Sequence, residues 1–414
     1  MTDIAGTVPV IAVDKVQAVA LAVCTYYFGV WLKGKVGVLS RYSIPSPVVG
    51  GMSFAIVVSF LEYFNIVKVQ IDSTLQTVLM LGFFTTIGLM ASLRVVKDGG
   101  RLLLGFLLAV TVLVFLQNGM GMAIAEAMGF DKHYGILAGS VSMMGGLGTA
   151  AAFGPYFEET YGITGGTAVA VTAATLGMVE GLLIGDPKGQ WSIRRSQEKR
   201  PDEVQRPEPE LHLPDDMVSD FTDQHASAKP NFSNEIMRAV SVTALAMGLG
   251  TIVSNYLGHY ITLPAYIGAM IVATVIRNVG DFSGMYKVEG KGLNAVADIT
   301  LVLFVTMAIN NLKLHELVHL ALPLVVILAC QTILMLIYAW TVLFTAFGRS
   351  YDAVMLSVGG IGFSMRATAN GLANKQAISE KYGSSPRAWL IVSVVGAFLI
   401  DLIKAVVITW FGTL

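Results

Sequence analysis

The sequence predicts an all-α polytopic membrane protein, built from two inverted repeats of five transmembrane helices, each with a re-entrant hairpin. Three observations lead to this fold class. The 414 residues are 54% hydrophobic and 13% charged, with a mean hydropathy of +0.67, whereas soluble domains carry about 25% charged residues. Uncharged stretches of about 20 residues, the length that crosses a bilayer, recur in two sets. Lysine and arginine residues are distributed unevenly between the loops.

The apolar segments divide the chain into two membrane repeats and a polar linker. The first run has no basic n-region or cleavage site, so we expect a retained span. The expected segments of the N-terminal repeat, 1–185, are 16–32, 42–61, 73–93, 102–125, 134–157 and 160–179. A cytoplasmic linker loop is expected at 186–236, because this region holds six of the thirteen prolines and many charges. The expected segments of the C-terminal inverted repeat, 237–414, are 237–257, 264–280, 295–311, 317–347, 352–373 and 389–412.

The two repeats also resemble each other in sequence. The run Gly145–Gly148 matches Gly359–Gly362, and Gln117 matches Gln331 in the same order. An acidic residue lies 19 residues beyond Tyr161 and again beyond Tyr382; these residues are Glu180 and Asp401. The alternative is that glycine-rich apolar segments resemble one another through composition alone.

The basic residues predict the orientation of the chain in the membrane. If the fifth segment of each repeat enters and leaves by the same side, one side carries twenty lysine and arginine residues and the other carries four. The rich side is expected to be cytoplasmic. Five crossings then make the second repeat inverted relative to the first, with the linker in the cytoplasm and both termini outside it.

The glycine runs are the expected tips of the re-entrant hairpins. Glycine permits sharp reversal of the backbone, and in inverted-repeat transporters helix N-termini at such breaks face anionic substrates while free carbonyls bind the cation. The alternative is close helix packing through small residues. The residues assigned to substrate binding on this basis are Gly145, Gly146, Gly148, Thr149, Gly360 and Gly362.

Ionisable residues inside apolar segments are functional candidates, because burying them in a membrane is costly. Arg366 lies four residues beyond Gly362 and is expected to bind a substrate carboxylate through its planar guanidinium. The alternatives are a structural ion pair and a side chain that extends to the membrane surface. Asp401 is expected to ligate sodium; alternatively, it forms an ion pair with Lys404, one helical turn away. Glu180 is expected either to pair with Lys404 or to lie at the membrane interface.

Neutral oxygen donors complete the predicted site. Sodium is a hard cation that prefers oxygen ligands, so Asn118, Thr368 and Asn374 join Asp401 in the predicted sodium site, and Asn370 joins the substrate site. Each of them can alternatively form a hydrogen bond between helices. The sequence has no nucleotide-binding loop, nucleophile elbow or histidine–cysteine metal spacing, so it does not predict an enzyme. It also lacks the basic patches of nucleic-acid-binding proteins.

Several runs resemble the bacterial sodium/glutamate symporter family. These runs are Tyr42–Gly51, Gly82–Leu89, Gln117–Asn118, Leu137–Ser140 and Val395–Asp401, and the resemblance covers nearly the whole chain outside the linker. It implies a secondary transporter of the bacterial inner membrane, contacting lipid, with inverted five-helix repeats, a homodimeric assembly and elevator-type movement. The positions at which this chain departs from the family pattern lie in or beside the predicted site and are Leu147, Ala150, Glu180, Arg366, Ala369, Lys375 and Lys404.

The function expected from these features is sodium-coupled import of glutamate or a closely related anionic amino acid. A cation/proton antiporter, with Asp401 and Glu180 exchanging protons for sodium, is the main alternative. A channel or a receptor that does not transport is a third, suggested only by the long linker. The sequence leaves open the exact substrate, the sodium stoichiometry, the choice between sodium and proton coupling, and the oligomeric state.

Overall fold

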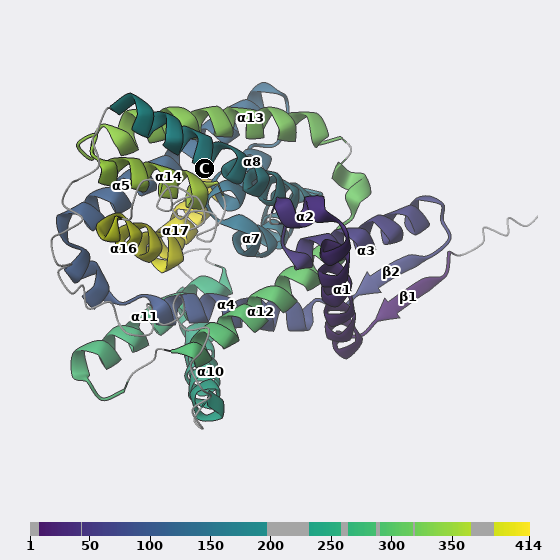
Figure 1. Ribbon diagram of the computed structural model, residues 1–414. Coiled ribbons are helices and arrows are strands. Elements are labelled where there is room, and N and C mark those ends of the chain that lie inside the picture. Colours follow the sequence, from purple (N-terminus) through teal and green to yellow (C-terminus); the bar gives the residue numbers. More distant parts are fainter. Residues whose placement is uncertain are drawn as a thin grey trace, which may run out of the picture.

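A computed structural model describes residues 8–42, 44–196, 232–257, 264–286, 290–317, 319–365 and 385–414. Within these ranges the regular structure is helical, apart from one small sheet (Figure 1). Seven of the described helices are long and apolar enough to cross a membrane.

The first repeat follows the predicted segments closely. Its helical elements are α1 (Lys15–Lys35), α2 (Gly37–Arg41), α3 (Ser46–Tyr63), α4 (Thr74–Met90), α5 (Leu93–Ala127), α6 (Lys132–Ile136), the π-helical η1 (Leu137–Val141), α7 (Gly146–Tyr161) and α8 (Gly166–Ser196). Helix α8 continues past residue 185, where we placed the end of the repeat. Proline at position 187 does not end it, although a proline inside a helix removes a backbone hydrogen bond.

The second repeat follows the same order of segments. Its elements are α10 (Phe232–Leu257), α11 (Ala265–Ser283), α12 (Lys291–Asn310), the 3₁₀ helix η3 (Leu314–Leu317), α13 (Ala321–Tyr338), the π-helical η4 (Ala339–Phe344), α14 (Tyr351–Ser364), α16 (Pro386–Val394), the π-helical η5 (Val395–Leu399) and α17 (Ile400–Gly412). The predicted segment 352–373 is described only as far as residue 365.

A two-stranded parallel sheet was not predicted from the sequence. Strand β1 (Val10–Val13) pairs with β2 (Lys68–Ile71), with Val10 opposite Lys68. Both strands are too short for periodicity to reveal them, and each lies directly beside an apolar helix. The sheet joins the segment before α1 to the loop between α3 and α4, so these two regions lie at the same end of the molecule.

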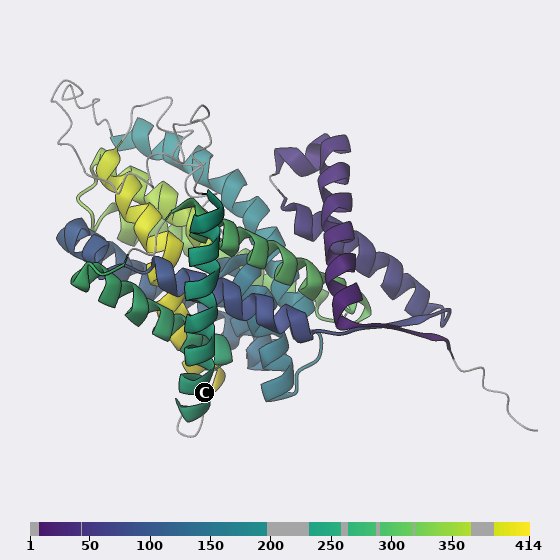
Figure 2. The same ribbon diagram turned by 90° about the horizontal axis from the view of Figure 1, so that it is seen from below.

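The helices pack into two bundles, and each bundle takes helices from both repeats. The first bundle contains the three leading helices of each repeat, namely α1, α3, α4, α10, α11 and α12. The second bundle contains α5 to α8, α13, α14, α16 and α17, and the short α2 packs on α1. In Figure 1 the first bundle occupies the lower part and the right side, and the second fills the upper left; Figure 2 shows the same division after a 90° turn.

Aromatic side chains form part of the boundary between the two bundles. Phe84 of α4 stacks on Tyr266 of α11 with ring centroids 4.5 Å apart, and Phe153 of α7 meets the same tyrosine edge-on at 5.5 Å. Phe84 and Tyr266 both belong to the first bundle, so among these three residues Phe153 makes the contact between the bundles. Nearby, Gly148 of α7 lies so close to Phe83 that an added Cβ would be 3.0 Å from its ring.

The connection from α4 to α5 is fastened to the first bundle by polar contacts. The hydroxyl of Ser92 donates to a carboxylate oxygen of Asp281 at 2.6 Å, and the backbone N–H of Leu93 donates to the side-chain oxygen of Asn278 at 2.8 Å. Arg277 pairs with the same aspartate at 3.0 Å. Beyond these contacts, Gly100 has a φ of +61° and interrupts the helical geometry of α5. The chain therefore turns at Gly100 as it enters the second bundle.

Candidate functional site

The first glycine run lies at a break in the helical chain; whether this break is the tip of a re-entrant hairpin stays a prediction. Gly139 leaves helical geometry inside η1, with φ −88° and ψ −125°, and α7 begins at Gly146, whose φ of +67° is in the left-handed region that favours glycine. No side chain caps the start of α7. The first turn of α7, which contains Gly146, Gly148 and Thr149, therefore presents backbone N–H groups without a side-chain partner.

The second glycine run does not form the predicted reversal. Helix α14 is continuous through Gly359–Gly362 and ends at Ser364, where Met365 has φ −108° and ψ 25°. A Cβ added to Gly360 would lie 2.8 Å from the Cδ1 atom of Leu343 in η4. Gly360 and Gly362 thus lie in a closely packed helix, which is the alternative role of small residues in membrane helices. The break comes after these glycines.

The two breaks meet on helix α8. A Cβ added to Gly177 would lie 2.9 Å from the sulfur of Met143, just before the first break, and 3.6 Å from the carbonyl oxygen of Met365, at the second. Gly181, one turn further along α8, faces Met365 in the same way. Sequence reasoning missed both α8 glycines, although their spacing of four residues is the small-residue pattern of closely packed membrane helices.

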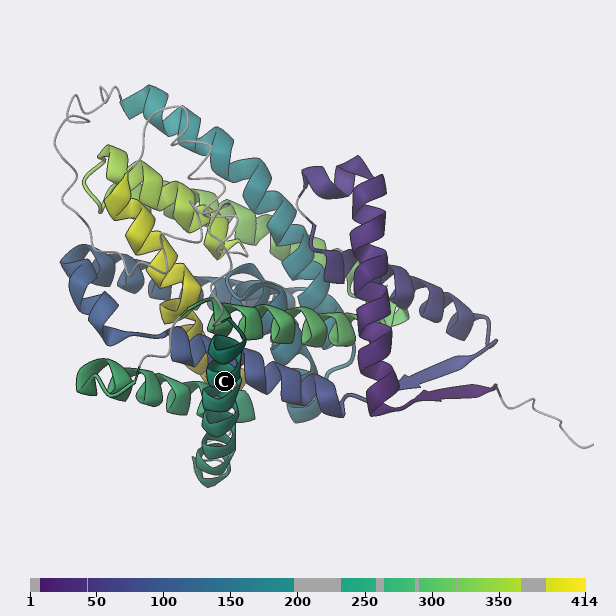
Figure 3. The ribbon, with the colours of Figure 1, turned by 60° about the horizontal axis from the view of Figure 1, so that its bottom comes forward.

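Buried polar side chains surround this junction. The residues are Gln117 and Asn118 of α5, Ser140 of η1, Gln331 of α13 and Ser364 of α14, and all have 0% exposed surface. We call these five residues the junction cluster. In Figure 3 the helices that carry them run close together in the second bundle.

Hydrogen bonds link the members of the junction cluster across both repeats. The side-chain amide of Gln331 donates to the backbone carbonyl of Gln117 at 2.7 Å, and the amide of Gln117 donates to the carbonyl of Ser364 at 3.4 Å. Asn118 accepts a hydrogen bond from the backbone N–H of Ser140 at 3.1 Å. The symmetric glutamines of the two repeats therefore contact each other directly.

Each member of the junction cluster also has one polar atom without a hydrogen-bond partner among the described residues. These atoms are Gln117 Oε1, Asn118 Nδ2, Ser140 Oγ, Gln331 Oε1 and Ser364 Oγ. Leaving a buried polar atom unpaired costs about 1–3 kcal/mol, so these five atoms make the junction cluster a candidate binding site. Carbonyl and hydroxyl oxygens suit a hard cation such as sodium, and amide and hydroxyl donors suit a carboxylate.

The predicted acidic residues have partners of their own. Asp401, at the start of α17, forms an ion pair with Lys404, whose side chain is 2% exposed. Glu180 accepts a hydrogen bond from the hydroxyl of Thr332 at 2.6 Å. The pair of Asp401 with Lys404 is the alternative that the sequence allowed, and Glu180 contacts Thr332 in place of Lys404. The sequence analysis did not identify Thr332 as a partner of Glu180. The signal was its position directly after Gln331, which matches the position of Asn118 directly after Gln117.

Four predicted site residues, Arg366, Thr368, Asn370 and Asn374, lie outside the described residues. They follow Ser364 and Met365 directly in the chain. Their roles stay predictions.

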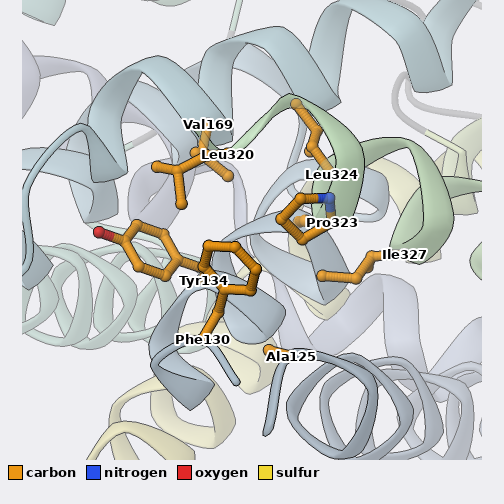
Figure 4. A pocket seen from close by; sticks show the side chains of 9 residues that line it. Ala125, Phe130, Tyr134, Val169, Leu320, Pro323, Leu324 and Ile327 are labelled. Atoms are coloured by element: carbon orange, nitrogen blue, oxygen red, sulfur yellow. The ribbon is translucent and has the colours of Figure 1, made fainter. Parts of the chain in front are cut away.

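An apolar cleft elsewhere in the second bundle does not fit the predicted substrate. It lies between α5, α6, α8 and α13 and has a volume of about 10 Å³, close to the minimum that holds one water molecule. Figure 4 shows that its wall consists of side chains such as Phe130, Val169 and Leu324. Within the described ranges, no group of three or more histidine, cysteine, aspartate or glutamate residues is placed to hold a metal ion.

Comparison with known proteins shows the family of the chain. Residues 11–384 match the family model described as sodium/glutamate symporter. The sodium/glutamate symporter of Escherichia coli K12 is 36% identical over 401 residues, which cover 95% of this chain and 96% of the relative. The sodium/glutamate symporter of Haemophilus influenzae is 34% identical over 395 residues, or 94% and 95% of the two chains. With a match this extensive, the chain belongs to the sodium/glutamate symporter family.

Proposed function

We propose that this protein imports glutamate or a closely related anionic amino acid together with sodium across the bacterial inner membrane. The observation that carries the proposal is the junction cluster, in which five buried polar atoms lack partners among the described residues at the place where two broken helices meet. Family membership supports sodium and glutamate as the two solutes.

The two helix ends at the junction are suited to opposite charges. The N-terminus of α7 carries a partial positive charge and uncapped N–H groups, so it attracts a substrate carboxylate. The C-terminus of α14 carries a partial negative charge and brings the carbonyl of Ser364 against Gln117. Sodium would then be bound by carbonyl, amide and hydroxyl oxygens on the α14 side, with the predicted ligands Thr368 and Asn374. Asn118, also a predicted ligand, would contribute the oxygen that accepts from the N–H of Ser140.

The residues that follow Met365 supply the rest of the proposed substrate site. Arg366 would hold a second carboxylate through two parallel hydrogen bonds, and Asn370 would orient it. Asp401 contributes to the cation site only when its pair with Lys404 rearranges, because the lysine already neutralises its charge.

Alternating access is proposed to occur by elevator-type movement of the second bundle along the first. The mixed composition of each bundle supports this, as does the turn at Gly100, which follows the contacts that fasten residues 92 and 93 to α11. Exposed apolar side chains on α1, α3 and α10 would contact lipid or a second copy in a homodimer.

The proposed orientation places the linker in the cytoplasm and both termini outside. Segments assigned to one side do lie together: β1 pairs with β2, and His133 contacts the carbonyl oxygen of Gly412 through Nε2 at 3.1 Å. Cysteines placed one at a time at residue 5 and within 200–230 test the orientation. We expect the first to react only from outside and the second only from the cytoplasm; labelling of both from one side would contradict the five-plus-five arrangement.

A cation/proton antiporter is the second candidate, favoured by the buried pair of Asp401 and Lys404. Counterflow in proteoliposomes separates the candidates. With labelled glutamate, aspartate and a dicarboxylate that lacks an amino group, we expect sodium-dependent exchange of glutamate. Sodium-driven proton movement without uptake of any organic solute would instead support the antiporter.

A further inference from the structure

The two matched acids of the repeats differ in how their negative charge is balanced. Asp401 of α17 pairs with Lys404, one turn further along the same helix, and this lysine is 2% exposed. The pair has no net charge, and because both residues belong to one helix, no movement between helices separates them. Glu180 of α8 is half-buried and has a neutral partner instead, the hydroxyl of Thr332 at 2.6 Å. A hydroxyl donor leaves the charge of this glutamate in place.

The carboxylate of Glu180 can accept a further partner. In the part of the chain that the structure describes, the ion pairs join other residues, and no positive side chain pairs with Glu180. Only one of its two carboxylate oxygens, Oε2, has a hydrogen-bond partner there. A carboxylate inside a membrane helix is costly unless a positive charge compensates it. The first repeat therefore brings an uncompensated charge to α8.

The surroundings of this glutamate add further negative charge. Gly181, the next residue, lies against the end of α14: an added Cβ would be 3.4 Å from the carbonyl oxygen of Met365 and 3.9 Å from that of Gly362. Carbonyl groups at a helix C-terminus carry the negative end of the helix dipole. On the α13 side, Thr332 directly follows Gln331, whose Oε1 is one of the unpaired atoms of the junction cluster. Carboxylate, hydroxyl, amide and carbonyl oxygens from three helices thus lie in one region.

We infer that Glu180 supplies the carboxylate of the sodium site at the junction. Sodium is a hard cation that prefers oxygen ligands. The ion is attracted both by the full charge of Glu180 and by the negative end of α14, and its binding removes the repulsion between them. The pair of Asp401 with Lys404 stays intact, so Asp401 takes no transported cation. The inference rests on the proposed function, since it assumes that sodium is the coupling ion.

Sodium binding to the purified full-length protein tests this assignment. Thermal unfolding is measured without glutamate, in sodium chloride and in choline chloride of equal ionic strength, because an ion that binds only the folded state raises the melting temperature. Glu180→Gln should need about tenfold more sodium than the wild type for the same shift, as expected for the loss of a charged ligand. Glu126→Gln makes the same change at an exposed acid of α5 and is the matched control, which should respond to sodium as the wild type does.

A double variant, Asp401→Asn with Lys404→Gln, distinguishes the two acids, because it removes both charges of the pair and leaves no lone charge. A tenfold rise in the sodium requirement of this variant, with no rise in Glu180→Gln, would assign the carboxylate to Asp401 and overturn the inference. A Glu180→Gln protein that melts at a lower temperature in choline chloride but responds to sodium as the wild type does would also overturn it. The partner of Glu180 would then be a positive side chain of the protein.

Uptake into proteoliposomes separates a failure of this inference from a failure of the proposed function. If the wild type takes up glutamate in a sodium-dependent way, Glu180→Gln should raise the sodium concentration for half-maximal uptake by about tenfold, and Glu126→Gln should not. An unchanged sodium dependence in Glu180→Gln would refute the role of Glu180 and leave the proposed function standing. Absence of sodium-dependent uptake by the wild type would instead contradict the proposed function itself.

Discussion

The two glycine runs have nearly the same sequence but different local structures. Gly145–Gly148 lies at a break, with Gly146 at positive φ and α7 starting there, whereas Gly359–Gly362 lies within the continuous helix α14. The first repeat thus brings a helix N-terminus to the junction, and the second brings a helix C-terminus. The junction thereby contains both a partly positive and a partly negative helix end. Sequence similarity between repeats does not imply the same backbone at each copy.

The largest expected difference between the repeats concerns their two matched acids. Asp401→Asn removes the negative charge that pairs with Lys404 and leaves the buried lysine unpaired. This should lower the free energy of unfolding by about 3–5 kcal/mol. Glu180→Gln keeps an oxygen that accepts from Thr332 and should change stability little. Thermal unfolding of the purified proteins without substrate measures both. Equal melting temperatures for the two variants would show that the pair with Lys404 does not contribute to stability.

Variants of Arg366 test whether the second repeat binds a substrate carboxylate through a side chain, whereas the first repeat is proposed to bind one through backbone N–H groups. Arg366→Lys keeps the charge but loses the planar fork, so apparent glutamate affinity should fall by about tenfold or more, as expected for a hydrogen bond to a charged group. Glutamate with sodium should raise the melting temperature of the wild type by mass action.

Arg366→Gln removes the charge as well. Glutamate with sodium should therefore not raise the melting temperature of this variant. A thermal shift in this variant as large as in the wild type would exclude Arg366 from the substrate site.

The glycines themselves provide a smaller and more local contrast. Gly146→Val forces a β-branched residue into the left-handed region, at a cost of about 1–2 kcal/mol or more, and should abolish uptake. Gly360→Ala places a Cβ against the end of the Leu343 side chain, which can shift, so uptake should be reduced but retained. Uptake assays normalised to inserted protein compare them. Full activity of Gly146→Val would show that the first break needs no glycine.

The smallest expected effect concerns the symmetric glutamines. Gln331→Leu removes the hydrogen bond to the Gln117 carbonyl, and Gln117→Leu removes the weaker one to the Ser364 carbonyl; each loss is expected to cost about 1 kcal/mol. If their free oxygens ligate sodium, both variants need more sodium for half-maximal uptake. A sodium dependence identical to wild type in both would limit these residues to helix packing.

The sequence predicted most of the helical fold because membrane spans are long and uniformly apolar. It did not reveal β1 and β2, since four residues give too little periodicity, or the two mixed bundles, since packing between distant helices leaves no local pattern. Within the site, Asn118 and the first glycine run lie at the junction, and their roles in binding sodium and substrate stay predictions. Gln117, Gln331, Gly177 and Gly181 were not recognised as site residues, because uncharged side chains in apolar helices are ordinarily packing residues.

The small parallel sheet constrains how the chain is threaded. Its strands are separated in sequence by α1 and α3, and they can pair only if both emerge on one face of the bilayer. An even number of crossings must therefore lie between residues 13 and 68. During synthesis β1 has to wait, unpaired, until α3 has been inserted and β2 follows it. Pairing of the two strands therefore depends on correct insertion of both helices. A chain that inserts α1 or α3 wrongly leaves β1 without its partner strand.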